Sequence, residues 1–136
     1  MSRSNELIAL IAGISMFVMG SASAIAGDAT KGKKVFNKCK ACHSPVQGVN
    51  RIGPSLFGVV GRQCGSVPKA RHSSVYKAAC AKAPFAWDED KLATYLTDPS
   101  KYLSAIAGEK KRSTMTLKLR KPKDRADVIA YLKSVK

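Results

Sequence analysis

Two cysteines and a histidine lie within five residues of one another. The segment reads Cys39-Lys40-Ala41-Cys42-His43, which has the C-x-x-C-H spacing that attaches a c-type haem. On a helical turn, two thiols at this spacing can add to both vinyl groups of one porphyrin, and the next residue presents an imidazole to the iron. We therefore expect covalent haem attachment through Cys39 and Cys42, with His43 as one axial ligand.

Two other kinds of site also use a C-x-x-C pair. A thioredoxin-like redox motif opens a helix after a strand of a βαβ unit, and no such alternation follows here. A zinc site needs four ligands. The other cysteines and the other histidine, Cys64, His72 and Cys80, are scattered without a second close pair. The spacing therefore favours haem over both alternatives.

The N-terminus has the features of a secretory signal peptide. A basic residue, Arg3, precedes an uninterrupted apolar run over residues 7–19, and the small residues 20–26 contain A-x-A cleavage patterns. We expect cleavage after Ala26, leaving one domain over residues 27–136 in the periplasm. An uncleaved membrane anchor is the alternative, because residues 7–27 carry no charge.

The second axial ligand decides the chemistry of such an iron. A methionine gives a closed electron-transfer site, whereas an open position favours ligand binding or catalysis. Once residues 1–26 are removed, Met115 is the only methionine left, so we expect it to be that ligand, with a role as core filler as the alternative. His72 lies in a polar segment, and we expect it to be a solvated loop residue.

The chain is strongly basic, with a formal net charge of +15 in 136 residues. Such an excess indicates an electronegative partner. Nucleic acid is disfavoured, because the chain is exported and has no recognition motif. Acidic docking surfaces of redox proteins are favoured as partners, with transient contact to an anionic membrane surface as a second option. The alternative is that the positive charge serves solubility alone.

Cys64 and Cys80 remain after the haem cysteines are assigned. In an oxidising compartment they are expected to form a disulfide, which would close a loop of about 15 residues and stabilise the fold by roughly 3 kcal/mol. Two free buried thiols are the alternative, because the sequence does not show that the two Cα atoms come within bridging distance.

The residues that carry this chemistry must be positioned by helices and loops. Helices are predicted over residues 28–39, 77–86, 89–97 and 122–135, with Asp28 and Asp88 as N-caps and Pro122 in a first turn. The segment 44–68 is rich in Gly and Pro and is predicted to be a wrapping loop. Residues 104–114 are predicted to be an exposed basic loop. No strand alternation predicts a sheet.

Several blocks in this order resemble the class I c-type cytochromes, specifically the bacterial relatives of mitochondrial cytochrome c. Besides the haem motif, the landmarks are the segments 51–62, 87–90, 95–99, 115–116 and 125–132. The resemblance implies an all-α cytochrome c fold, in which three main helices, short helices and loops wrap one covalently bound haem c. The first and last helices would cross near Gly32, with Phe36 and Tyr131 at the contact.

The resemblance also implies roles around the haem. Pro54 would accept a hydrogen bond from the proximal imidazole, Tyr76 and Trp87 would bind a haem propionate, and Arg62 would neutralise it. Tyr95 and Ser113 would lie beside the methionine ligand. The chain departs from the family pattern by insertions before Tyr76 and around residues 103–112. Cys64 and Cys80 are not family landmarks either.

The expected function is that of a soluble, monomeric, periplasmic single-electron carrier that is not an enzyme. Its donor would be a quinol-cytochrome c oxidoreductase or a dehydrogenase, and its acceptor an oxidase or a similar protein, in a respiratory or photosynthetic chain. Lysines near the haem edge would steer docking. The alternative is a haem-based gas sensor or a peroxidase-like enzyme with an open or labile sixth position, which requires that Met115 leave the iron.

Overall fold

The computed structural model describes residues 25–136, and the predicted signal peptide lies almost wholly outside the described residues. The elements in chain order are α1 (Ala29–Val35), the 3-10 turn η1 (Phe36–Lys38), α2 (Ser74–Lys82), α3 (Glu89–Thr97), α4 (Pro99–Ala107) and α5 (Pro122–Ser134). Within residues 25–136 the only β contact is an isolated bridge between Gln63 and Ala86. The prediction of an all-α protein is confirmed.

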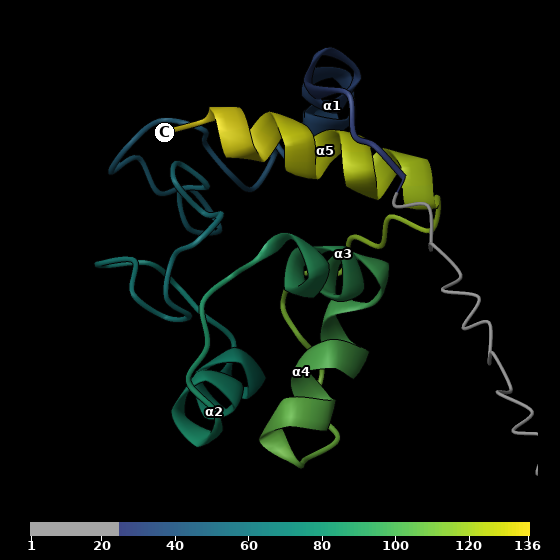
Figure 1. Cartoon of the computed structure of the whole chain (residues 1–136). Coiled ribbons are helices and arrows are strands. Elements are labelled where there is room, and N and C mark those ends of the chain that lie inside the picture. Colours follow the sequence, from purple (N-terminus) through teal and green to yellow (C-terminus); the bar gives the residue numbers. More distant parts are fainter. Residues whose placement is uncertain (1–24) are drawn as a thin grey trace, which may run out of the picture.

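The helices pack in two groups, with a long irregular segment beside them. Figure 1 shows α1 and α5 crossing at one end of the molecule, α3 beneath α5, and α2 and α4 at the other end. The segment between η1 and α2 carries no helix and follows the side of the helices. Within the described part of the chain, no helix is long and apolar enough to cross a membrane.

The crossing of α1 and α5 depends on a glycine. A Cβ at Gly32 would overlap the main-chain carbonyl of Asp127 and lie 2.9 Å from the Cβ of Tyr131. The backbones therefore approach more closely than any side chain allows, and the rings of Phe36 and Tyr131 pack beside them with centroids 5.2 Å apart. This contact, expected near Gly32, is confirmed.

The same crossing is fixed by polar groups. The Asp28 side chain accepts a hydrogen bond from the amide of Lys31 at 3.1 Å and so caps α1, as predicted. The Asp28 amide in turn donates to Oδ1 of the buried Asp127 on α5 at 2.7 Å. The first residues of the domain are thereby tied to its last helix.

The short helix in the middle of the chain begins earlier than predicted. We expected residues 77–86, but α2 spans Ser74–Lys82. Its N-cap is Ser73, whose hydroxyl accepts from the Tyr76 amide at 3.3 Å. Serine is a strong N-cap because its oxygen satisfies an amide in the first turn, and this signal was overlooked in the polar run before Tyr76.

The prediction of an exposed loop over residues 104–114 is wrong for its first four residues, which belong to α4. Asp98 ends α3 and also caps α4 by accepting from the Lys101 amide at 3.0 Å, and Pro99 occupies the first turn. Leu103 is fully buried. Residues 110–112 are exposed, as predicted.

The core lies between α1, α3 and α5. Its buried members include Phe36, Trp87, Leu92, Leu96, Val128, Ile129 and Leu132. α3 has the bounds predicted for it, and Asp88 caps it by accepting from the Lys91 amide at 2.7 Å. α5 ends one residue before the predicted boundary. Sequence periodicity thus located the helices that form the core.

Candidate functional site

The Cys39–His43 segment is a tight turn that follows η1. The amide of Cys42 donates to the Cys39 carbonyl at 3.0 Å, and the amide of His43 donates to the same oxygen at 2.9 Å. Both cysteines are free thiols, Cys39 buried and Cys42 exposed. Burial raises the pKa of Cys39 to about 11, opposed by the charge of Lys38. The turn therefore presents two free thiols and an imidazole.

His43 is held by the loop that follows it. Its Nδ1 lies 2.8 Å from the Pro54 carbonyl, which can only accept, so Nδ1 carries the proton and the lone pair of Nε2 is free to bind a metal. Burial lowers the pKa of His43 and keeps it neutral, with a smaller opposing effect from this hydrogen bond. A Cβ at Gly53 would lie 2.9 Å from Nδ1, so only glycine fits against the ring.

Met115 lies in a second cluster, built by α3, α4 and the segment after α4. The Tyr95 hydroxyl donates to Met115 Sδ at 3.3 Å, and the Met115 amide donates to Ser113 Oγ at 3.2 Å. Ser113 is in turn held by Ser100, whose Oγ accepts from its amide at 3.0 Å. Burial raises the pKa of Tyr95, so its phenol remains a donor. The thioether is therefore held at both its backbone and its sulfur.

Ser100 is a contributor to this cluster that the sequence reasoning missed. It lies in the first turn of α4, and the unrecognised helix hid its role. The Asp98-Pro99 pair could have revealed it, because an aspartate N-cap followed by a first-turn proline is typical of a helix start.

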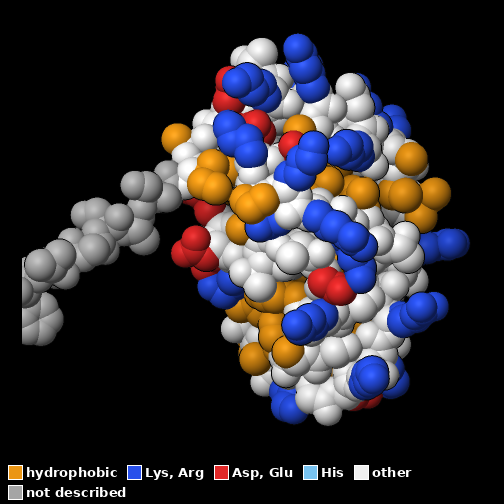
Figure 2. Space-filling view, turned by 90° about the vertical axis from the view of Figure 1, so that its right-hand side faces the viewer, with side chains coloured by type: hydrophobic (Ala, Val, Ile, Leu, Met, Phe, Trp, Pro, Cys, Tyr) orange, Lys and Arg blue, Asp and Glu red, His pale blue; other side chains and the backbone are white. Residues whose placement is uncertain are grey.

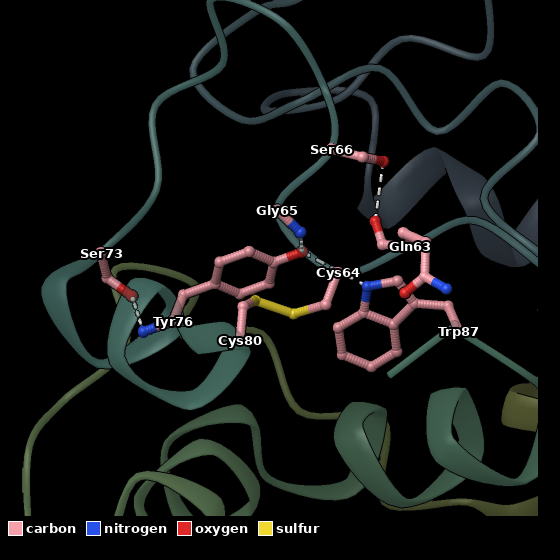
Figure 3. Close-up of a disulfide and its surroundings, with 8 residues drawn as sticks. All are labelled: Gln63, Cys64, Gly65, Ser66, Ser73, Tyr76, Cys80 and Trp87. Atoms are coloured by element: carbon pink, nitrogen blue, oxygen red, sulfur yellow. Dashed lines mark hydrogen bonds between the residues drawn. A yellow bond between two sulfur atoms is a disulfide. The ribbon is translucent and has the colours of Figure 1, made fainter. Parts of the chain in front are cut away.

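Tyr76, Trp87 and Arg62 form a third group. The Trp87 indole Nε1 and the Gly65 amide both donate to the Tyr76 hydroxyl, each at 3.3 Å (Figure 3). Trp87 is buried, and its ring lies 4.9 Å from that of Tyr95, which links this group to the methionine cluster. Arg62 donates to the carbonyls of Ser55 and Phe57 at 2.9 and 3.0 Å.

A disulfide braces this third group. Cys64 and Cys80 are bonded, with Cα atoms 5.5 Å apart, inside the range that a disulfide needs. Figure 3 shows the bond beside the Tyr76 ring, connecting α2 to the turn that contains Gly65. The Cys64 amide also donates to the Phe85 carbonyl at 2.8 Å. The disulfide therefore lies among the residues that hold the Tyr76 hydroxyl.

His72 does not have the surroundings predicted for it. We expected a solvated loop residue, but its Nε2 is buried without a hydrogen-bond partner. Its ring stacks on Tyr76 with centroids 4.5 Å apart and planes inclined by 8°. The stacking explains the difference, because it turns the imidazole back against the Tyr76 ring instead of into solvent.

The ligand atoms of these residues match the requirements of a covalently bound haem. Two neighbouring free thiols, an imidazole with an unprotonated Nε2 and a fixed thioether are the set that a covalent haem with two axial ligands requires. In the third group the half-buried Tyr76 phenol accepts from the Trp87 indole, which leaves its own O–H to donate to a carboxylate. The residues therefore fit the group.

Comparison with known proteins agrees with this donor set. The Cytochrome c family model matches residues 29–136. The chain is 48% identical to a cytochrome c-550 of Novispirillum itersonii over 112 residues, which cover 81% of this chain and all of that protein. It is 44% identical to a cytochrome c2 of Rhodobacter capsulatus over 124 residues, covering 85% and 88% of the two chains.

Solved structures give the same result. The structure of cytochrome c2 from Rhodospirillum centenum superimposes with a TM-score of 0.74 and 37% identity, covering 80% of this chain and 98% of the other. A cytochrome c2 from Paracoccus denitrificans gives a TM-score of 0.72 at 37% identity, covering 80% and 96%. The motif, the fold and these matches together show that the chain belongs to the cytochrome c family of electron carriers, which are not enzymes and carry one covalently bound haem c.

Proposed function

We propose that the chain is an exported, periplasmic single-electron carrier whose iron is ligated by His43 and Met115. Cys39 and Cys42 would hold the haem, which supplies an iron that takes up and releases one electron. The observation that carries this proposal is the fixed thioether: Tyr95 donates to Met115 Sδ at 3.3 Å while Ser113 holds the Met115 amide.

Pre-positioned ligands suit electron transfer. His43 is oriented by Pro54 on one side, and Met115 is oriented by Tyr95 and Ser113 on the other. Side chains that are already fixed need no rearrangement when the charge on the iron changes, so little energy is spent on reorganisation. The buried Trp87 and Leu96 near the methionine cluster would help to exclude water. A sensor or peroxidase-like role would instead require a mobile methionine.

The optical spectrum tests the ligation directly. The oxidised wild type is expected to show the weak long-wavelength band of sulfur-to-iron charge transfer, and Met115→Ala is expected to lose it and to bind carbon monoxide in the reduced state. Leu117→Ala is the matched control, since Leu117 is a half-buried residue of the same segment. If the wild type lacks the band and binds carbon monoxide readily, the sixth position is open, and the sensor or enzyme alternative is favoured.

The proposed location rests on the N-terminal segment, with cleavage expected after Ala26. Export is supported by the C-x-x-C-H motif and by the Cys64–Cys80 disulfide, since disulfides persist in oxidising compartments. Mass measurement of protein purified from the periplasmic fraction tests it. A mature mass that begins at Gly27 and includes one haem is expected, and an uncleaved chain in the membrane fraction would contradict it.

The proposed partners are redox proteins with acidic docking surfaces. Figure 2 shows lysine and arginine side chains over much of one face, and the net charge is +15. Residues 110–112, next to the Met115 segment, are all basic and exposed. Long-range attraction between such a surface and an acidic one speeds association and is screened by salt. Association with an acidic redox partner should therefore slow as ionic strength rises, and a rate independent of salt would refute the proposal.

A further inference from the structure

The Nε2 atom of His72 is buried but makes no hydrogen bond. Among residues 25–136 it is the only fully covered side-chain nitrogen or oxygen that has no hydrogen-bond partner. Leaving such a group unpaired costs roughly 1 to 3 kcal/mol. Buried polar groups in native proteins are nearly always paired, so an unpaired one indicates a partner that is not part of the polypeptide.

The His72 ring is held in place by the residues around Tyr76. It stacks on the Tyr76 ring at 4.5 Å. Tyr76 is itself fixed at both ends, by the Ser73 hydroxyl at its amide and by Trp87 Nε1 and the Gly65 amide at its phenolic oxygen. The imidazole is therefore held in one orientation by this group and does not rotate freely.

The surroundings of His72 are cationic. Burial lowers its pKa, and the charges of Lys77 on α2 and Arg62 on the facing loop lower it further. Tyr76 is the other titratable residue in contact with it. No carboxylate acts on the imidazole within this set. A neutral N–H donor beside a guanidinium lacks an anionic acceptor, and a carboxylate matches both.

We propose that His72 Nε2–H donates a hydrogen bond to a haem propionate carboxylate, next to Tyr76, Trp87 and Arg62. The proposal rests on the proposed function, because it needs the bound haem. His72 lies just before α2, outside the segments in which the sequence resembles the family. His72 would thereby add a donor to those of Tyr76, Trp87 and Arg62.

A hydrogen bond at this position links a proton to the electron. The oxidised iron carries one more positive charge than the reduced iron, which disfavours the imidazolium nearby. The pKa of His72 is therefore expected to be lower in the oxidised protein than in the reduced protein. By linkage, the midpoint potential falls as the pH rises through the interval between these two pKa values.

Nitrogen-15 NMR of the imidazole in the haem-loaded wild type is the first test. We expect the neutral tautomer with the proton on Nε2, slow exchange of that proton with solvent, a hyperfine shift in the oxidised protein, and a pKa that differs between the two oxidation states. Rapid exchange as in a solvated imidazole would overturn the proposal. An Nε2 proton whose cross-relaxation is with a bound water alone would do so too.

Redox titration over a range of pH supplies a second readout. His72→Phe keeps an aromatic ring to stack on Tyr76 but removes Nε2, and Arg71→Gln is the matched control because it removes an exposed charge one residue away. We expect His72→Phe to lose the slope of potential against pH that wild type and Arg71→Gln share. Equal slopes in all three would overturn the proposal.

The two proposals fail in different ways. Loss of the sulfur-to-iron band in wild type would reject the ligation by Met115, whatever His72 does. A normal band together with a solvent-exchanging His72 would reject only the role of His72. If His72→Phe does not fold, the NMR measurement on the wild type still decides.

Discussion

Replacing Gly32 by alanine tests whether the helix crossing depends on close backbone contact. Two effects of this substitution have opposite signs. Alanine stabilises a helix relative to glycine by about 1 kcal/mol. At Gly32, however, the new methyl group would overlap the main-chain carbonyl of Asp127 and crowd the Cβ of Tyr131. Neither obstacle can move by a change of rotamer, so the helices themselves must separate.

The size of the effect follows from the distance that the helices must move. To bring the new Cβ to an ordinary contact distance from the Asp127 carbonyl, α1 must shift by more than about 1 Å. A gap of about 0.5 to 1 Å already removes a quarter to a half of a dispersion contact, so this shift would remove at least that much from nearby contacts, including those of the fully buried Phe36. Overpacking at the upper end of its usual range costs about 3 kcal/mol. After the helix gain of about 1 kcal/mol, the net loss is about 2 kcal/mol.

Urea unfolding of the holoprotein, followed by far-ultraviolet circular dichroism, measures this loss. Thr30→Ala is the matched control, because it places alanine at an exposed position of the same helix, where the change should stay within about 0.5 kcal/mol. Gly32→Ala is expected to lower the midpoint at an unchanged slope. If it is as stable as wild type or more stable, as helix propensity alone requires, the close contact is not what keeps glycine there.

Two further perturbations test other parts of the fold. Replacing both Cys64 and Cys80 by serine is expected to lower the free energy of unfolding by about 3 kcal/mol, because the bond closes a loop with a sequence separation of 16. Unfolding of the ferrous wild type and variant, each with and without thiol reductant, measures this loss. Equal stabilities of the two proteins without reductant would contradict the prediction. The Asp127 carboxylate accepts from the Asp28 amide and pairs with Lys123, which holds the pKa of Asp127 below its ordinary value. Its stabilising contribution is therefore complete above about pH 5 and is lost as the pH falls through about 4 toward the folded pKa; Asp127→Asn should show a smaller loss of unfolding free energy on acidification than wild type, and an identical loss would contradict the reasoning.

Local signals predicted most of the helices. Asp28 and Asp88 cap α1 and α3 where expected, because an N-cap depends on a side chain and an amide only three residues apart. α4 was missed because Asp98-Pro99 was interpreted only as the end of α3. The same pair both ends one helix and begins the next. A signal with two local meanings is resolved by packing, here by the burial of Leu103.

The site residues also differ in whether local sequence could predict them. The C-x-x-C-H motif is readable because its chemistry is contained in five residues, and the structure places those residues on one turn. Pro54, Tyr95 and Ser113 were expected only through family resemblance, and the structure brings each beside its expected neighbour, His43 or Met115. The surroundings of His72 were not predictable. They depend on how the segment before α2 folds against Tyr76, which no periodicity encodes.

The Cys64–Cys80 bond has a consequence for the biogenesis of the protein. Four cysteines allow three complete pairings, and only the one that joins Cys64 to Cys80 can later leave Cys39 and Cys42 to the porphyrin. Before attachment, Cys42 is exposed to thiol exchange, whereas the raised pKa of the buried Cys39 makes it a poor nucleophile. Chains with a wrong cysteine pairing would therefore compete with haem attachment. Removing Cys64 and Cys80 would lower the stability of the mature protein yet raise the fraction of chains that receive haem. The yield of holoprotein and its stability would then change in opposite directions.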